Sequence, residues 1–139
     1  MTSVTSGPLT IRIVPLRCVK TEVARARRAI RRILTGCPEA LIDTAELCAS
    51  EIVTNAIVHS DSAKLGGTIL LVVVQSSGSV RVEVVDHGSR AKEPRVASGS
   101  ESDSEDGRGL LILEASCDSW GCYEDEAGRT VWFAIGASR

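Results

Sequence analysis

SEIVTNAIVHS, residues Ser50 to Ser60, has the apolar spacing of a buried helix but also carries Glu51, Asn55 and His59, each four residues apart. At about 100° per residue, Glu51 and Asn55 lie about 40° apart, at the border of the apolar seam. An amide or charge buried without a partner is costly, so we expect something polar beside this edge. A solvated polar pair on a helix edge is the ordinary alternative. We expect His59 to cap or line the helix end.

The chain has the size and composition of one globular domain. Its 139 residues are 43% hydrophobic, enough for a single core, and its net charge of -2 argues against nucleic acid as a partner. No apolar run approaches the roughly 20 residues that a bilayer span needs. The start, MTSVTSGPLTIRIV, lacks the features of a secretory signal. We therefore expect one cytoplasmic domain over residues 1–139, with no membrane contact.

The cysteines give no metal or disulfide pattern. Their number is odd, no CxxC pair occurs, and only two histidines are present, whereas a zinc site needs four well-placed ligands. We expect small buried thiols in a reducing compartment. The five residues are Cys18, Cys37, Cys48, Cys117 and Cys122.

The first half of the chain predicts a strand followed by two helices. Leu9 to Val14 alternates apolar and polar residues, and an apolar stripe follows from Arg17 to Leu34. A second helix is expected from about Pro38 to His59, because proline is favoured in a first turn. Its predicted buried seam consists of Leu41, Ala45, Cys48, Ile52 and Ala56.

The second half predicts two hairpins. Gly67 to Gln75 is nearly all apolar, as expected of a central strand, and Val80 to Asp86 returns after a turn. Residues 87–106 lose all pattern, which indicates a functional loop or local disorder. A short helix follows Gly107, and the strands 118–125 and 128–136 close the chain. This order predicts a two-layer α/β (α+β) sandwich, with a mostly antiparallel sheet, helices on one face and a core of about 9–136.

Asp86 is the second candidate for a polar site. In VRVEVVD, the residues Val80, Val82, Val84 and Asp86 share one face, which we expect to point toward the helices. The carboxylate would then end the strand pointing inward, where it could accept a hydrogen bond from an amine. An Asx-type turn at the strand end explains the same residue.

Two glycines form the third candidate. Gly107 and Gly109 bracket the start of a helix, whose unpaired backbone N–H groups can bind an anion such as phosphate. A flexible hinge is the alternative. The chain contains no GxxxxGK[ST] motif, so a P-loop is absent.

Together these motifs resemble the GHKL (histidine kinase-like) ATP-binding fold, also called the Bergerat fold. SEIVTNAIVHS resembles its N box, DHG at 86–88 its first glycine box, and GRGLLIL at 107–113 its second. Trp120-Gly121 and GRTVWF at 128–133 resemble the closing strands of a small single-domain branch, the anti-sigma-factor serine kinases. The resemblance covers roughly Leu9 to Ile135.

The resemblance implies a role for each matching residue. Asn55 would be the protein ligand of Mg²⁺, and Glu51 would orient or deprotonate the attacking hydroxyl or water. Asp86 would accept the exocyclic amine of adenine, which selects ATP over GTP. Gly88 would let the base approach the backbone, and Thr130 matches a hydroxyl near the adenine.

The resemblance also implies a lid over about 87–109. Gly107, Arg108 and Gly109 would close over the phosphates, and Leu110 would start the helix behind them. Two features differ from the family pattern. The first glycine box lacks its second glycine, and Glu105 and Asp106 stand where the kinases have an arginine that meets the terminal phosphate. Arg90, Arg95 and Arg108 are the candidate replacements.

Two functions follow. The first is an ATP/Mg²⁺-dependent serine/threonine kinase that phosphorylates a STAS-type anti-sigma-factor antagonist and sequesters a sigma factor. The second, favoured by the altered lid, is a non-catalytic ATP-binding module whose output is partner capture. Homodimerisation is common in this branch, but the sequence fixes no interface. The basic first helix is either a solvated face or a contact for an acidic protein surface, with nucleic acid ranked last.

Overall fold

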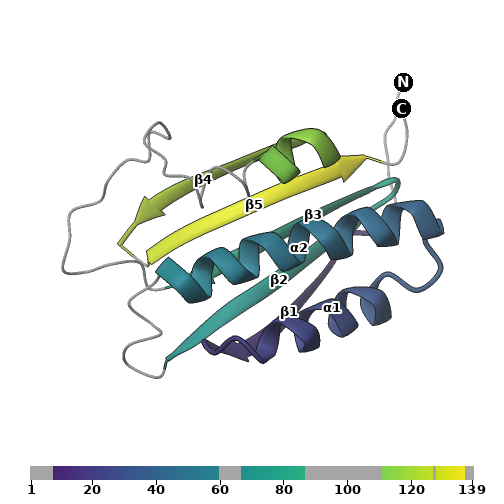
Figure 1. The fold of residues 1–139 in the computed structure, drawn as a ribbon. Coiled ribbons are helices and arrows are strands. Elements are labelled where there is room, and N and C mark those ends of the chain that lie inside the picture. The colour runs from purple at the N-terminus through teal and green to yellow at the C-terminus, as the bar shows by residue number, and fades with distance from the viewer. Residues whose placement is uncertain (1–7, 60–66, 87–110, 127, 137–139) are drawn as a thin grey trace.

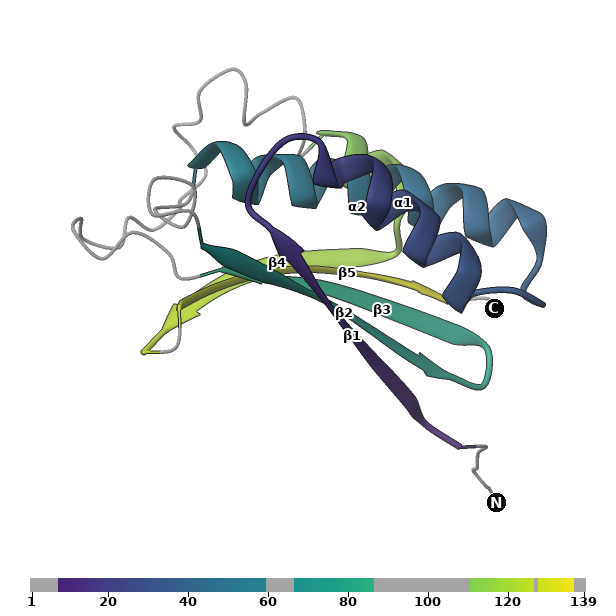
Figure 2. The same cartoon turned by 90° about the horizontal axis from the view of Figure 1, so that it is seen from below.

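The computed structural model describes residues 8–59, 67–86, 111–126 and 128–136. Its sheet has the order β1-β2-β3-β5-β4, and every neighbouring pair is antiparallel. Both long helices cover one face of this sheet (Figures 1 and 2). The predicted two-layer α/β sandwich is confirmed. The elements are β1 (Thr10–Arg17), α1 (Glu22–Ile33), α2 (Glu39–His59), β2 (Thr68–Ser76), β3 (Ser79–Asp86), β4 (Ser119–Asp125) and β5 (Gly128–Gly136), with a helical turn at 111–116 before β4.

The core lies between α2 and the centre of the sheet. All five residues of the predicted α2 seam are at most 8% exposed, and α2 packs against β3 and β5. A second row is also buried because α1 lies against that side of α2. This row comprises Ile42, Ala49, Val53 and Ile57. The inward face of β3 is buried throughout, as predicted. No described helix has both the length and the apolar character that crossing a membrane requires.

The first helix begins at Glu22, not at Arg17 as the sequence predicted. β1 continues to Arg17 and pairs with β2 along its whole length, which buries Leu16 in the core. Pro15 is compatible with this strand because β1 is at the edge of the sheet, where a missing N–H group is tolerated. The Glu22 carboxylate then accepts a hydrogen bond from the backbone N–H of Arg17, at 2.8 Å. That contact fixes the turn between strand and helix.

Glu22 gives a pH-dependent prediction. The hydrogen bond from the Arg17 backbone holds the pKa of Glu22 below its ordinary value of 4.5, and the charge of Arg25 acts in the same direction. A lowered folded-state pKa stabilises the fold above the ordinary value, and this contribution is lost as the pH falls through the lowered value. Glu22→Gln should therefore lower the free energy of unfolding at pH 7. In denaturant titrations, the difference in free energy of unfolding between Glu22→Gln and the wild type should become smaller as the pH falls below 4.5. The exposed control Glu124→Gln should show no such trend.

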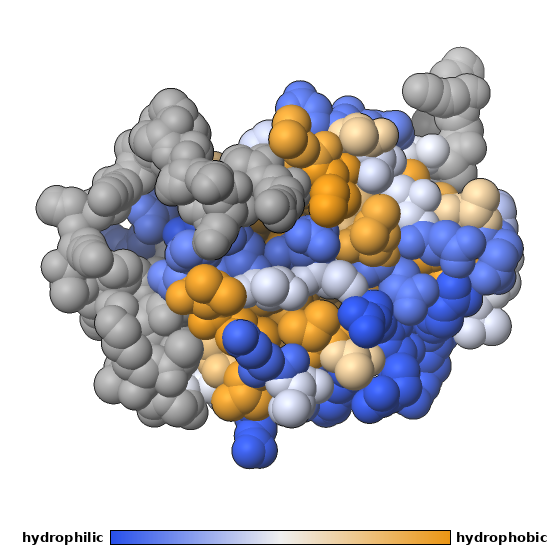
Figure 3. Space-filling view, viewed as in Figure 1, coloured by the Kyte–Doolittle hydropathy of each residue, from blue (hydrophilic) through white to orange (hydrophobic). Residues whose placement is uncertain are grey.

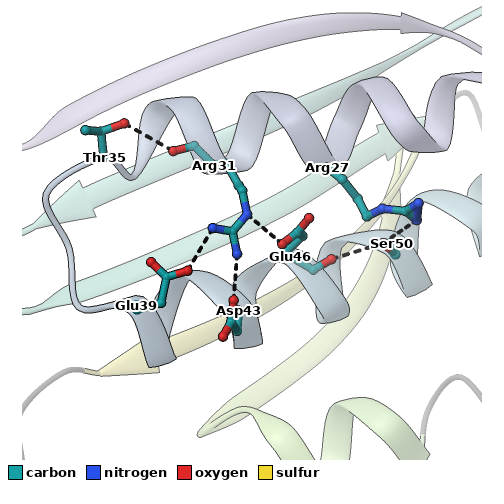
Figure 4. A network of polar contacts seen from close by, with 7 residues as sticks. All are labelled: Arg27, Arg31, Thr35, Glu39, Asp43, Glu46 and Ser50. Atoms are coloured by element: carbon teal, nitrogen blue, oxygen red, sulfur yellow. Dashed lines mark hydrogen bonds and ion pairs between the residues drawn. The ribbon is translucent and has the colours of Figure 1, made fainter.

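Arg31 joins α1 to α2 through three carboxylates (Figure 4). Its Nη1, Nη2 and Nε atoms lie 2.9, 2.6 and 2.9 Å from oxygens of Glu39, Asp43 and Glu46, respectively. The hydrogen bonds to Glu39 and Glu46 raise the pKa of the Arg31 guanidinium above its ordinary value. Hydrophilic residues gather at this end of the helix-bearing face (Figure 3).

We expect Arg31→Gln to lower the melting temperature, because three carboxylates would then lie together without a cation. Since the pairs are partly exposed, the difference should shrink as salt is added. Arg28→Gln is the matched control, on an exposed position of the same helix with no ion pair among the described residues. Equal melting temperatures for the two variants in low salt would contradict this role.

Candidate functional site

Three elements carrying candidate residues end at the same side of the molecule. The C-terminal end of α2, the C-terminal end of β3 and the N-terminal end of β5 lie together in Figure 1, and α2 packs against both strands. The fold therefore gathers Asn55, Asp86 and Thr130 at this end, although they are far apart in the sequence.

Asp86 is a buried carboxylate on the helix side of the sheet. It is only 4% exposed, it ends β3, and it continues the row of Val82 and Val84 that faces the helices. The sequence prediction of an inward-pointing acid is confirmed. Its direct cross-strand partner in β5 is Arg129.

Cys18 is a neighbour of Asp86 that sequence reasoning did not identify as part of the site. Its thiol is 3% exposed, and its pKa is raised by burial and further by the charge of Asp86. The Cys18 backbone N–H donates to the Gly67 carbonyl at 3.0 Å, where β2 begins. Only the sheet order brings the end of β1 close to the end of β3, so the local sequence carries no signal for this contact.

Thr130 is buried but does not lie directly opposite Asp86. The register pairs it with Val85 of β3 and Tyr123 of β4, one position away from the partner of Asp86. Strand alternation assigns this row to the face away from the helices. The register therefore does not by itself bring the Thr130 hydroxyl to the Asp86 carboxylate, and its role beside adenine stays a prediction.

Glu51 and Asn55 lie one turn apart on α2, at the edge of its buried side. Both are half-buried, whereas their neighbours Ile52, Val53 and Ala56 are buried. Neither polar side chain makes a hydrogen bond or ion pair within the part of the chain that the structure describes. The amide and the carboxylate are therefore available to a ligand. His59 is the exposed last residue of α2.

Leu113, at the end of the predicted second glycine box, and the turn that follows it pack into the core near Cys48 and Glu51. Leu113 is 1% exposed in the core, and the Cys117 thiol donates to the Leu113 carbonyl at 3.0 Å. Burial raises the pKa of Cys48 to about 12, with smaller contributions from Cys117 and Glu51. These three side chains are thus close in space.

The cysteines are only partly as predicted. Cys18 and Cys48 are buried, Cys37 and Cys117 are half-buried, and Cys122 is exposed. Cys122 is exposed because β4 is an edge strand of the sheet. The prediction of buried thiols is therefore wrong for Cys122.

The remaining candidates lie outside the described residues. These are the lid at about 87–109 and the residues Gly88, Gly107, Arg108, Gly109 and Leu110. Their roles stay predictions.

The described residues fit a nucleotide-bound magnesium better than a protein-bound metal. Across 8–59, 67–86, 111–126 and 128–136, no three His, Cys, Asp or Glu side chains converge on one point. Mg²⁺ that arrives with a nucleotide takes most of its oxygen ligands from phosphates and water, so one amide oxygen from Asn55 is sufficient. In its ionised form the buried Asp86 carboxylate would only accept hydrogen bonds, which suits the amine of a purine.

Comparison with known proteins gives one family and one fold. The sequence profile of the histidine kinase-like ATPase domain family matches residues 18–135 of this chain. The crystal structure of the RsbU and RsbW domains of Rv1364c from Mycobacterium tuberculosis aligns with a TM-score of 0.71 and 20% sequence identity. The alignment covers 94% of this chain but 33% of that one, so this chain spans about a third of its length. No curated protein matches the sequence significantly.

Proposed function

This chain belongs to the histidine kinase-like ATPase domain family, and we propose that it binds ATP with Mg²⁺ and regulates transcription as an anti-sigma-factor serine/threonine kinase. The observation that carries the proposal is the buried carboxylate of Asp86, which ends β3 on the helix side where the Asn55 end of α2 also lies. We expect the protein to act in the cytoplasm, where ATP is available.

Each described residue would have a separate task. Asp86 would accept the adenine amine, and the Asn55 amide oxygen would hold the Mg²⁺ that neutralises the phosphates. ATP supplies the phosphoryl group. Glu51, half-buried and without a protein partner among the described residues, would accept the proton of the attacking hydroxyl. Phosphoryl transfer depends mainly on such positioning and on charge neutralisation.

The other assignments complete the proposal. Gly88 would allow close approach of the base. The resemblance also places Thr130 near the adenine, but the register puts its row on the other face of the sheet from Asp86, so the proposal gives Thr130 no direct contact with the Asp86 carboxylate. Gly107, Arg108 and Gly109 would close over the phosphates, with Leu110 starting the following helix.

We propose a STAS-type anti-sigma-factor antagonist and a sigma factor as partners. The likeness in fold to a chain that contains an RsbW domain supports this choice. Helix α1 has fewer unpaired cations for a protein contact than its composition predicts. Arg25 and Arg31 already form ion pairs with acids of this chain. Arg28 and Arg32 have no ion pair within the described residues and would face an acidic partner.

The second candidate function is an ATP-binding module without catalysis. It is favoured by Glu105 and Asp106, which precede the predicted phosphate-binding glycines and would repel phosphate. The two functions differ in one assay. The chain is incubated with labelled ATP, Mg²⁺ and a STAS-type antagonist that co-purifies from the host. Transfer of label to the antagonist supports the kinase, whereas ATP binding without transfer supports the module.

A further inference from the structure

We propose that Arg129 is a second base-reading residue of the nucleotide site, which donates a hydrogen bond to ring atom N1 of adenine while Asp86 accepts one from the adenine amine. The sheet register makes Arg129 of β5 the direct cross-strand partner of Asp86. The motifs of the sequence give Arg129 no role. This inference rests on the proposed ATP site and concerns which base that site selects.

Arg129 lies on the same face of the sheet as Asp86. Residues that pair directly across antiparallel strands point to the same side, with Cβ atoms about 4.5–5.5 Å apart. Two and four positions further along β5, Val131 and Phe133 are buried in the core, so this row of β5 faces the helices. The row of Thr130 points to the other side. Arg129 is therefore the residue that β5 presents at the end of the molecule where α2 and β3 also end (Figure 1).

Arg129 is half-buried but has no acceptor within the described parts of the chain. The other described arginines that are half-buried are both paired. Arg31 binds three acids of α2, and the Nε atom of Arg81 lies 2.7 Å from an oxygen of Glu83. The Arg129 side chain makes no hydrogen bond or ion pair across 8–59, 67–86, 111–126 and 128–136. A guanidinium has only donors, and its partial removal from water is costly without an acceptor, so a ligand is expected to supply one.

The two acids beside Arg129 do not supply that acceptor. Arg129 pairs in register with Asp86 of β3 on one side and with Glu124 of β4 on the other, but no ion pair joins it to either within the described structure. Glu124 is exposed on an edge strand, where water can solvate it. Asp86 is only 4% exposed. The inner end of the row therefore presents a carboxylate acceptor and guanidinium donors side by side.

An acceptor next to a donor matches one edge of adenine and opposes the same edge of guanine. Adenine carries its amine, a donor, next to N1, an acceptor. Guanine carries O6, an acceptor, next to N1–H, a donor. Guanine in the same position would bring O6 against the Asp86 carboxylate and N1–H against the Arg129 guanidinium. Both contacts would be repulsive, so the two residues together select adenine more strongly than Asp86 alone.

A contact to the base can be distinguished from a contact to phosphate. A phosphate contact would strengthen the binding of every nucleoside triphosphate alike, whereas a contact to N1 depends on the base. The register favours the base, because Arg129 is the immediate neighbour of the residue assigned to the adenine amine, and the phosphates are assigned to Mg²⁺ and Asn55 on α2.

The test is calorimetry of the full chain with Mg²⁺ and two nucleotides, ATP and 1-deaza-ATP, in which N1 is replaced by C–H. The wild type should bind 1-deaza-ATP about tenfold more weakly than ATP, the size expected for one hydrogen bond from a charged donor. Arg129→Met keeps the apolar length of the side chain but removes its donors. It should bind both nucleotides equally, about as weakly as the wild type binds 1-deaza-ATP.

Arg81→Met is the matched control, the same change at a half-buried arginine of β3 on the other face of the sheet. It should keep the wild-type affinity for ATP and the tenfold preference over 1-deaza-ATP. Circular dichroism would show that both variants stay folded. The wild-type comparison of the two nucleotides needs no substitution, so it tests the N1 contact even where Arg129→Met does not fold.

Three results would overturn the inference. The first is equal wild-type affinity for ATP and 1-deaza-ATP. The second is a loss of affinity in Arg129→Met that leaves the tenfold preference unchanged, since the arginine would then act on phosphate or ribose. The third is an equal loss in Arg81→Met, which would make it an effect of net charge. ATP binding that depends on Asp86 but not on N1 would remove only the role of Arg129, whereas a wild type that does not bind ATP would remove the proposed function as well.

Discussion

Asp86→Asn is expected to weaken ATP binding about 100-fold, the largest effect on nucleotide affinity that we expect from a described residue. The carboxylate offers only acceptors, whereas the amide places an NH₂ donor where the adenine amine needs an acceptor. Loss of a charged hydrogen bond, with a donor left facing a donor, is of the size that gives this factor. Because Asp86 is only 4% exposed, bulk water has little access to replace the missing contact.

Thermal shift measures this effect directly. ATP at 100 times its dissociation constant should raise the melting temperature of the wild type by on the order of 10 °C. At the same ATP concentration, Asp86→Asn should show almost no shift. Asp125→Asn is the control, the same chemical change at an exposed residue that ends β4. Equal shifts in the two variants would remove Asp86 from the site.

Glu51→Gln is expected to lower phosphoryl transfer by roughly 100- to 10,000-fold, the range for loss of a positioned general base. The amide keeps the shape of the side chain but cannot accept a proton. Its binding of ATP should remain that of the wild type, since Glu51 is assigned to the attacking hydroxyl and not to the nucleotide.

Two measurements on the same preparations separate these roles. Single-turnover transfer to the antagonist gives the rate, and calorimetry gives the dissociation constant for ATP. Glu114→Gln, at an exposed position in the turn 111–116, should leave both unchanged. Transfer by Glu51→Gln at the wild-type rate would show that Glu51 is not the base. ATP binding by a wild type that transfers no phosphate would support the second function instead.

Local pattern predicted the parts of the fold that depend on local physics. The seam of α2 and the alternation of β3 follow from spacing alone, so the burial of Ile52 and the inward direction of Asp86 were predictable. The start of α1 was not, because it depends on the pairing of Leu16 with β2 and on a contact from Glu22 to Arg17. Such contacts join separate elements of the chain, and the pattern within each element does not show them.

The site shows the same division. Glu51 and Asn55 could be identified because a polar side chain at the edge of a buried helix is costly without a partner. The order of the motifs along the chain indicated that the partner is a nucleotide. The approach of Cys18 to Asp86 and of Cys117 to Cys48 arises only when strands and helices from both halves of the chain are assembled. The exposed face of β2 is a third case, since its apolar sequence gives no sign that one side lacks a cover within the described fold.

The most direct measurement is a crystal structure of the chain with Mg²⁺ and a non-hydrolysable ATP analogue. We predict the adenine amine within hydrogen-bond distance of the Asp86 carboxylate, and the Asn55 amide oxygen among the ligands of a Mg²⁺ that also binds the phosphates. A nucleotide bound elsewhere, or an adenine that makes no contact with Asp86, would contradict the account.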